Sequence, residues 1–78
     1  MIDILERTKH FAISIIRLYS ALPSTTVAQL LGKQALRSGT SVGTHLREGK
    51  RRRSDAEMIS KIEGAMQELE ETAYWIRL

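Results

Sequence analysis

The chain has 78 residues, of which 42% are hydrophobic, and a formal net charge of +3, which indicates one folded domain over residues 1–78. No apolar run approaches the roughly 20 residues that span a bilayer, and the absence of cysteine excludes disulfides and thiolate metal sites. The N-terminus has no basic segment followed by an apolar h-region, so we expect a cytoplasmic protein that is not bound to a membrane.

The first predicted helix runs from about Ile4 to Ser20. Asp3 and Glu6 have the spacing of a capping box, and Pro23 does not allow the helix to continue past Leu22. One face is marked by side chains that recur at steps of three and four, namely Ile4, Thr8, Phe11, Ile15, Leu18 and Leu22.

The second predicted helix begins at a Thr26–Gln29 capping box and ends at about Arg47. Each glycine in this segment lowers the stability of the helix by about 1 kcal/mol relative to alanine. Ala35, Gly39 and Gly43 recur every four residues, which predicts a smooth strip where a neighbouring helix approaches closely. The alternative is a loop that breaks the segment near Gly39. The apolar face is formed by Val27, Leu31, Ala35, Ser38, Val42 and Leu46.

The third predicted helix follows a Ser54–Glu57 capping box and continues to the end of the sequence. Its face is marked by Ile59, Ile62, Met66, Leu69, Ala73 and Ile76. Three such helices predict an all-α antiparallel bundle. Tyr74 and Trp75 place large apolar groups near the terminus, which indicates either an absent fourth helix or burial against another subunit. We therefore expect an oligomer, with helix packing or subunit contacts at Ala35, Gly39, Gly43, Tyr74 and Trp75.

Positive charge is concentrated between the second and third helices, because residues 47–53 sum to +4 and residues 54–78 to −4. Four adjacent cations repel one another unless water, phosphates or carboxylates surround them. No aromatic residue interrupts the run, so contact with a phosphate backbone is expected rather than base stacking. A solvated turn is the alternative. The candidate phosphate contacts are Arg37, Arg47, Lys50, Arg51, Arg52 and Arg53.

Catalysis and metal binding are poorly supported by the sequence. His10 and His45 lie in no metal-binding motif, and no phosphate-binding loop or dinucleotide fingerprint is present. Glu68, Glu70 and Glu71 form the one carboxylate cluster, which is more typical of an ion-pairing face than of acid–base catalysis. We expect no enzyme activity, no metal and no cofactor.

Five segments of the chain are distinctive: Leu22-Pro23, the stretch from Leu36 to Gly43, Glu48-Gly49, the stretch from Arg53 to Glu57, and the ending from Glu68 to Trp75. These segments resemble the bacterial four-helix-bundle family of 23S rRNA intervening-sequence proteins. The small-residue strip, the basic turn and the Glu-Thr-x-Tyr-Trp ending occur in the order of the family. The resemblance covers most of the chain.

The resemblance implies a bundle that assembles into a pentameric ring. It also implies a relationship to the accessory variability proteins of diversity-generating retroelements, which bind a reverse transcriptase and nucleic acid through basic surfaces. This chain has Thr44-His45 where the family commonly has Ala-Asn, and it lacks the fourth helix of its relatives. We expect a homo-oligomeric accessory protein that binds RNA or DNA through its basic turn. A structural or protein-interaction bundle without affinity for nucleic acid is the alternative.

Overall fold

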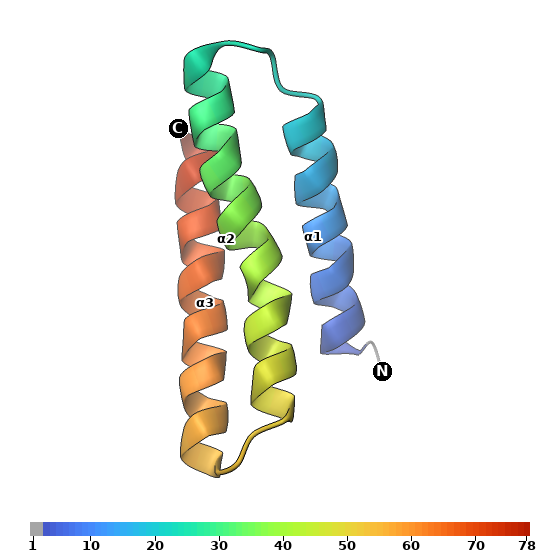
Figure 1. Cartoon of the computed structure of the whole chain (residues 1–78), viewed down its shortest axis with the longest axis vertical. Coiled ribbons are helices and arrows are strands. Elements are labelled where there is room, and N and C mark those ends of the chain that lie inside the picture. The colour runs from blue at the N-terminus through green and yellow to red at the C-terminus, as the bar shows by residue number, and fades with distance from the viewer. Residues whose placement is uncertain (1–2) are drawn as a thin grey trace.

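The computed structural model describes residues 3–78 and contains three α-helices, each antiparallel to the next along the chain (Figure 1). Helix α1 covers Ile4–Ser20, α2 covers Thr26–Lys50 and α3 covers Asp55–Arg77. The described part of the chain includes no strand, and it measures 44 × 23 × 16 Å. The predicted all-α architecture is therefore confirmed. None of the helices among these residues is long and apolar enough to cross a membrane.

Side chains cap the helices close to where the sequence predicts. Asp3 Oδ1 accepts a hydrogen bond of 2.9 Å from the backbone N–H of Leu5, which confirms it as the cap of α1. Glu6 does not complete a capping box, because its carboxylate lies 3.7 Å from His10 one turn later. At α3, the hydroxyl of Ser54 accepts from the N–H of Glu57 at 3.1 Å, as predicted.

The predicted capping box of α2 is wrong by one residue. Thr25, rather than Thr26, is the N-cap, and its hydroxyl accepts from the N–H of Ala28 at 3.2 Å. Gln29 serves a different purpose, since its side-chain oxygen accepts a 2.8 Å hydrogen bond from the hydroxyl of Tyr19. This bond ties the end of α1 to the start of α2.

Helix α2 is continuous through its glycines and ends at Lys50, three residues beyond the predicted end, so the alternative of a loop near Gly39 is wrong. Gly39 and Gly43 lie directly beneath α1. A Cβ atom at Gly39 would sit 2.9 Å from Cγ1 of Ile15, and one at Gly43 would sit 3.2 Å from Oγ1 of Thr8. The close approach recovers packing energy that offsets the poor helix propensity of these residues.

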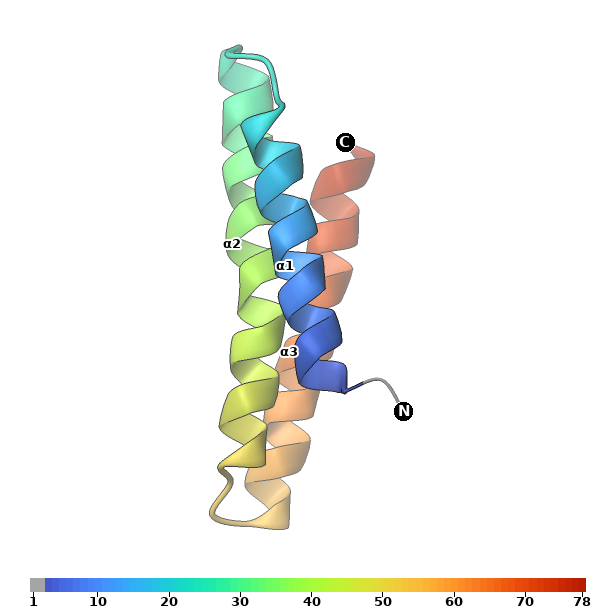
Figure 2. The same cartoon turned by 90° about the vertical axis from the view of Figure 1, so that its right-hand side faces the viewer.

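Helix α2 is the centre of the fold, because α1 and α3 both pack on it while their own backbones stay apart. No Cα atom of α1 lies within 8 Å of one in α3. Figure 2 shows both outer helices displaced to the same side of α2, so the three helices form a bent layer rather than a closed bundle. The buried apolar core is correspondingly small, and consists of Ile15, Ala35, Val42 and Ala65.

The contact between α2 and α3 contains a buried pair of hydroxyl groups. Ser38 is 0% exposed, Thr72 is 1% exposed, and their side-chain oxygens are 2.7 Å apart. The Ser38 hydroxyl also lies 3.0 Å from the carbonyl of Gln34, and the Thr72 hydroxyl lies 2.8 Å from that of Glu68. Buried hydroxyls are costly unless they are paired, so this contact fixes which face of α3 meets α2.

We expect Gly43→Leu to lower the free energy of unfolding by about 1–3 kcal/mol, because the new side chain overpacks the contact with Thr8. Thr44→Leu is the matched control, since Thr44 is exposed on the same helix, and it should change stability by no more than about 0.5 kcal/mol. Urea unfolding followed by circular dichroism, at one protein concentration, measures both. A Gly43→Leu variant as stable as the parent would show that α1 does not approach α2 closely.

Candidate nucleic-acid interface

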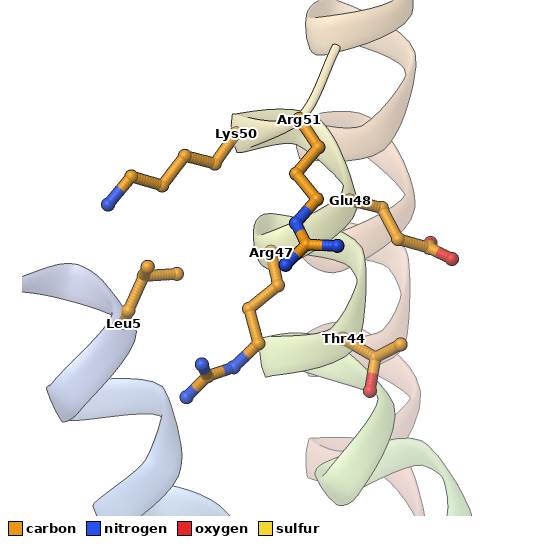
Figure 3. A pocket seen from close by; sticks show the side chains of 6 residues that line it. All are labelled: Leu5, Thr44, Arg47, Glu48, Lys50 and Arg51. Atoms are coloured by element: carbon orange, nitrogen blue, oxygen red, sulfur yellow. The ribbon is translucent and has the colours of Figure 1, made fainter.

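Three cations gather around a shallow hollow between the last turn of α2 and the first turn of α1 (Figure 3). We call Arg47, Lys50 and Arg51 the basic cluster. The hollow is also lined by Leu5, Thr44 and Glu48. Arg47 and Lys50 extend toward α1, whereas Glu48 points away from them. The hollow therefore presents positive charge beside the apolar side chain of Leu5.

The helical extension of α2 to Lys50 creates this arrangement. Positions 44, 47 and 51 are three and four residues apart, so their side chains share one helix face. Lys and Arg are also favoured in a last helical turn, where the unpaired carbonyls carry partial negative charge. Sequence analysis missed Leu5 and Thr44 as lining residues. Had the helix been predicted to continue past Arg47, the four-residue spacing would have placed Arg51 on the same face as Thr44 and Arg47.

Glu48, the acidic residue that lines the hollow, pairs with a cation outside the basic cluster. The carboxylate of Glu48 lies 3.2 Å from the amine of Lys61 on α3 and 3.9 Å from Nδ1 of His45. Among residues 3–78, the basic cluster has no carboxylate partner within 4.0 Å. Its three side chains are exposed, and their mutual repulsion is relieved when an anion binds between them.

Arg52 and Arg53, in the turn after α2, are placed differently from the basic cluster. The guanidinium of Arg52 lies 3.7 Å from the carboxylate of Asp55. The backbone N–H of Arg53 donates to the Glu57 carboxylate at 3.2 Å, while its side chain is exposed and unpaired among the described residues. Exposed ion pairs contribute only about 0–1 kcal/mol, so Arg52 can exchange Asp55 for a phosphate at little cost.

Arg37 lies apart from the other sequence-predicted phosphate contacts. Its guanidinium reaches across to α3, where it pairs with Glu71 and lies 3.5 Å from the Glu68 carboxylate. Glu71 also accepts a 2.9 Å hydrogen bond from the indole N–H of Trp75. Arg37 therefore joins α2 to α3, and its partners are two members of the carboxylate cluster. Arg37 lies 31 residues from Glu68 and 34 residues from Glu71, so local sequence patterns do not show that they pair within one chain.

The aromatic residues near the C-terminus lie on α3, which begins at the basic turn and runs away from it (Figure 1). Tyr74 is 56% exposed and contacts Trp75 edge-on, with 5.1 Å between the ring centroids.

His45 is half-buried against Gly64, and its Nδ1 has no hydrogen-bond partner among the described residues. Within residues 3–78, no group of three His, Asp or Glu side chains is arranged to hold a metal ion.

Comparison with protein families gives one match. The family model described as 23S rRNA-intervening sequence protein matches residues 1–78, the whole chain. No curated protein and no solved structure matches the sequence. The family to which the helix and turn motifs pointed is thereby confirmed over the full length.

We expect Arg37→Met to lower the free energy of unfolding by about 0.5–1 kcal/mol, because it leaves Glu68 and Glu71 close together without a cation. The loss should shrink in 1 M salt, where exposed charges are screened. Arg47→Met is the control, and since Arg47 has no paired carboxylate among residues 3–78 it should leave stability unchanged. Equal losses in both variants, measured by thermal or urea unfolding, would contradict the assigned role of Arg37.

Proposed function

Because the chain belongs to the family of 23S rRNA-intervening sequence proteins, we propose that it is a self-associating accessory protein that binds the phosphate backbone of RNA or DNA. The supporting observation is the basic cluster. Arg47, Lys50 and Arg51 converge on one open hollow and lack carboxylate partners among residues 3–78. Arg52 and Arg53 extend this positive surface into the adjoining turn. Such a role is non-catalytic and needs no cofactor.

This surface is better suited to contact with the phosphate backbone of a nucleic acid than to contact with its bases. Lysine and arginine recognise phosphate oxygens at any sequence, whereas single-strand binders that read bases stack them on aromatic rings. Tyr74 and Trp75 lie at the opposite end of α3 from the basic turn (Figure 1). The protein should therefore bind RNA and DNA with little sequence preference.

Self-association would make this weak surface effective. One copy offers about five cations, and several copies on one polyanion bind with a large gain in avidity. The family resemblance implies a ring of five copies. Binding should consequently strengthen with the length of the nucleic acid, until every copy in the assembly is engaged.

A protein-interaction module is the second candidate function. It is favoured by the apolar residues that α3 exposes, among them Ile59 at 58% and Met66 at 59%. Large exposed apolar surfaces mark protein contacts in folded domains. In this alternative the basic cluster would meet an acidic surface of a partner protein, such as the face from Glu68 to Glu71 of an adjacent subunit.

We expect the affinity of the double variant Arg47→Ala/Arg51→Ala for nucleic acid to fall less steeply than that of the parent as the salt concentration rises. With about six phosphates neutralised per complex, the parent should show a slope of log affinity against log salt near −5 for duplex DNA, and a shallower one for single strands. Removing two cations per copy should flatten the slope by about 2 for each copy in contact. Fluorescence anisotropy with labelled RNA and DNA over a salt series measures these slopes.

The matched control is Lys9→Ala/Lys33→Ala, which removes the same charge from exposed positions on α1 and α2 outside the hollow. It should keep the parent slope. If both double variants bind as the parent does, or if the parent binds neither RNA nor DNA at low salt, the protein-interaction module becomes the better account. Circular dichroism confirms that each variant keeps its helices.

A further inference from the structure

Among residues 3–78, Glu48 is the one carboxylate that lines the hollow of the basic cluster. It lies three residues before Arg51, a spacing at which side chains of opposite charge on a helix ordinarily meet. The carboxylate nevertheless points away from Arg47 and Lys50 (Figure 3). Its placement decides how much positive charge the hollow offers to an anion.

Helix α3 supplies the cation that holds Glu48. The Lys61 amine lies 3.2 Å from the Glu48 carboxylate, whereas no cation of the basic cluster lies within 4.0 Å of it among residues 3–78. The side chain of Lys61 is 33% exposed and that of Glu48 is 50% exposed. Salt screens a partly buried pair less than a fully exposed one. Lys61 is therefore a stronger partner for Glu48 than the exposed side chain of Arg51.

Two glycines bring side chains close to Glu48. A Cβ atom at Gly49 would sit 3.1 Å from Cβ of Lys61, so the stem of this lysine lies directly on the backbone of α2. A Cβ atom at Gly64 would sit 3.0 Å from Nδ1 of His45, which lies 3.9 Å from the Glu48 carboxylate. Because packing already restricts the Lys61 stem, less side-chain entropy is lost when the ion pair forms.

We propose that Lys61 sets the anion affinity of the basic cluster, although it lies outside the hollow. It is a positioning residue, because its amine holds the Glu48 carboxylate toward α3 and leaves Arg51 free to bind phosphate. When the amine is removed, Glu48 turns to Arg51 and neutralises one cation of each copy. This inference rests on the proposed function, in which the anion is the phosphate backbone of RNA or DNA.

Arg51 is the cation that a released Glu48 reaches. Arg47 and Lys50 extend toward α1 and away from Glu48 (Figure 3), whereas Arg51 follows it by three residues at the end of α2. A carboxylate beside a guanidinium occupies the donors that phosphate oxygens would otherwise use. The hollow would then offer two uncompensated cations instead of three.

The variant Lys61→Met tests the proposal by fluorescence anisotropy with labelled RNA and DNA. Methionine keeps a hydrocarbon stem to pack on Gly49, so the variant should fold, as circular dichroism can verify. Its affinity should fall about two- to fivefold for each copy in contact. The slope of log affinity against log salt should flatten by about 1 per copy.

Two control variants accompany this measurement. Lys33→Met removes the same charge from an exposed position of α2 outside the hollow, and it should bind nearly as the parent does. Lys61→Arg keeps a cation beside Glu48 and should retain the parent affinity. A Lys61→Met variant that binds as the parent does, or a Lys33→Met variant that loses as much affinity, would overturn the proposal.

The variant Glu48→Gln separates positioning from direct contact with phosphate. Once the carboxylate is absent, removal of the Lys61 amine releases nothing, so Glu48→Gln/Lys61→Met should bind as Glu48→Gln alone does. If Lys61 itself contacted phosphate, its removal would weaken binding equally with and without the Glu48 carboxylate. Equal weakening in both backgrounds therefore contradicts the positioning role.

Urea unfolding tests the hold on Glu48 without any nucleic acid. Arg51→Met should lower the urea midpoint by about 0.2–0.4 M more in the Lys61→Met chain than in the parent, because only a released Glu48 pairs with Arg51. If this difference is present while the parent binds neither RNA nor DNA, the proposed function fails and the placement of Glu48 by Lys61 is supported. An equal loss in both chains would overturn the proposal, whether or not nucleic acid binds.

Discussion

The fold depends on the close approach of two helices to the small residues of α2. Gly39 and Gly43 let α1 lie against its backbone, and Ser38 meets Thr72 of α3 on another side. A larger side chain at either contact would separate the helices and lose the short-range dispersion that holds them. No Cα atom of α1 lies within 8 Å of one in α3, so the described helices are held together mainly through α2.

This constraint explains why an apolar surface stays exposed. The buried hydroxyl pair and the ion pairs of Arg37 orient α3 so that small and polar residues meet α2. The longer hydrocarbon side chains of α3, such as Leu69 and Ile76, then line an open hollow together with Phe11 of α1. Burial of such side chains stabilises a fold by about 25 cal/mol per Å². The three helices leave much of that free energy to be gained by association.

The same geometry positions the charges. Helix α2 extends past the first turn of α1, so its last turn carries Arg47, Lys50 and Arg51 around an open hollow rather than into a packed interface. Arg37 lies in the middle of α2 and pairs instead with two carboxylates of α3. The hollow of the basic cluster adjoins a second hollow among the three helices, with which it shares Leu5 and Lys50.

The local sequence determines where the helices of this protein form, whereas the face of each helix that becomes buried depends on the packing of one helix against another. Asp3 and Ser54 cap helices through bonds within three residues, and Pro23 acts on the backbone beside it, so these ends follow from neighbours in the chain. The periodicity of α3 shows that a helix forms, yet not which of its faces is covered. That choice depends on Ser38 meeting Thr72, 34 residues away. The acidic partners of Arg37 could not be predicted for the same reason. Both this ion pair and the Ser38–Thr72 contact form only once α2 and α3 lie side by side.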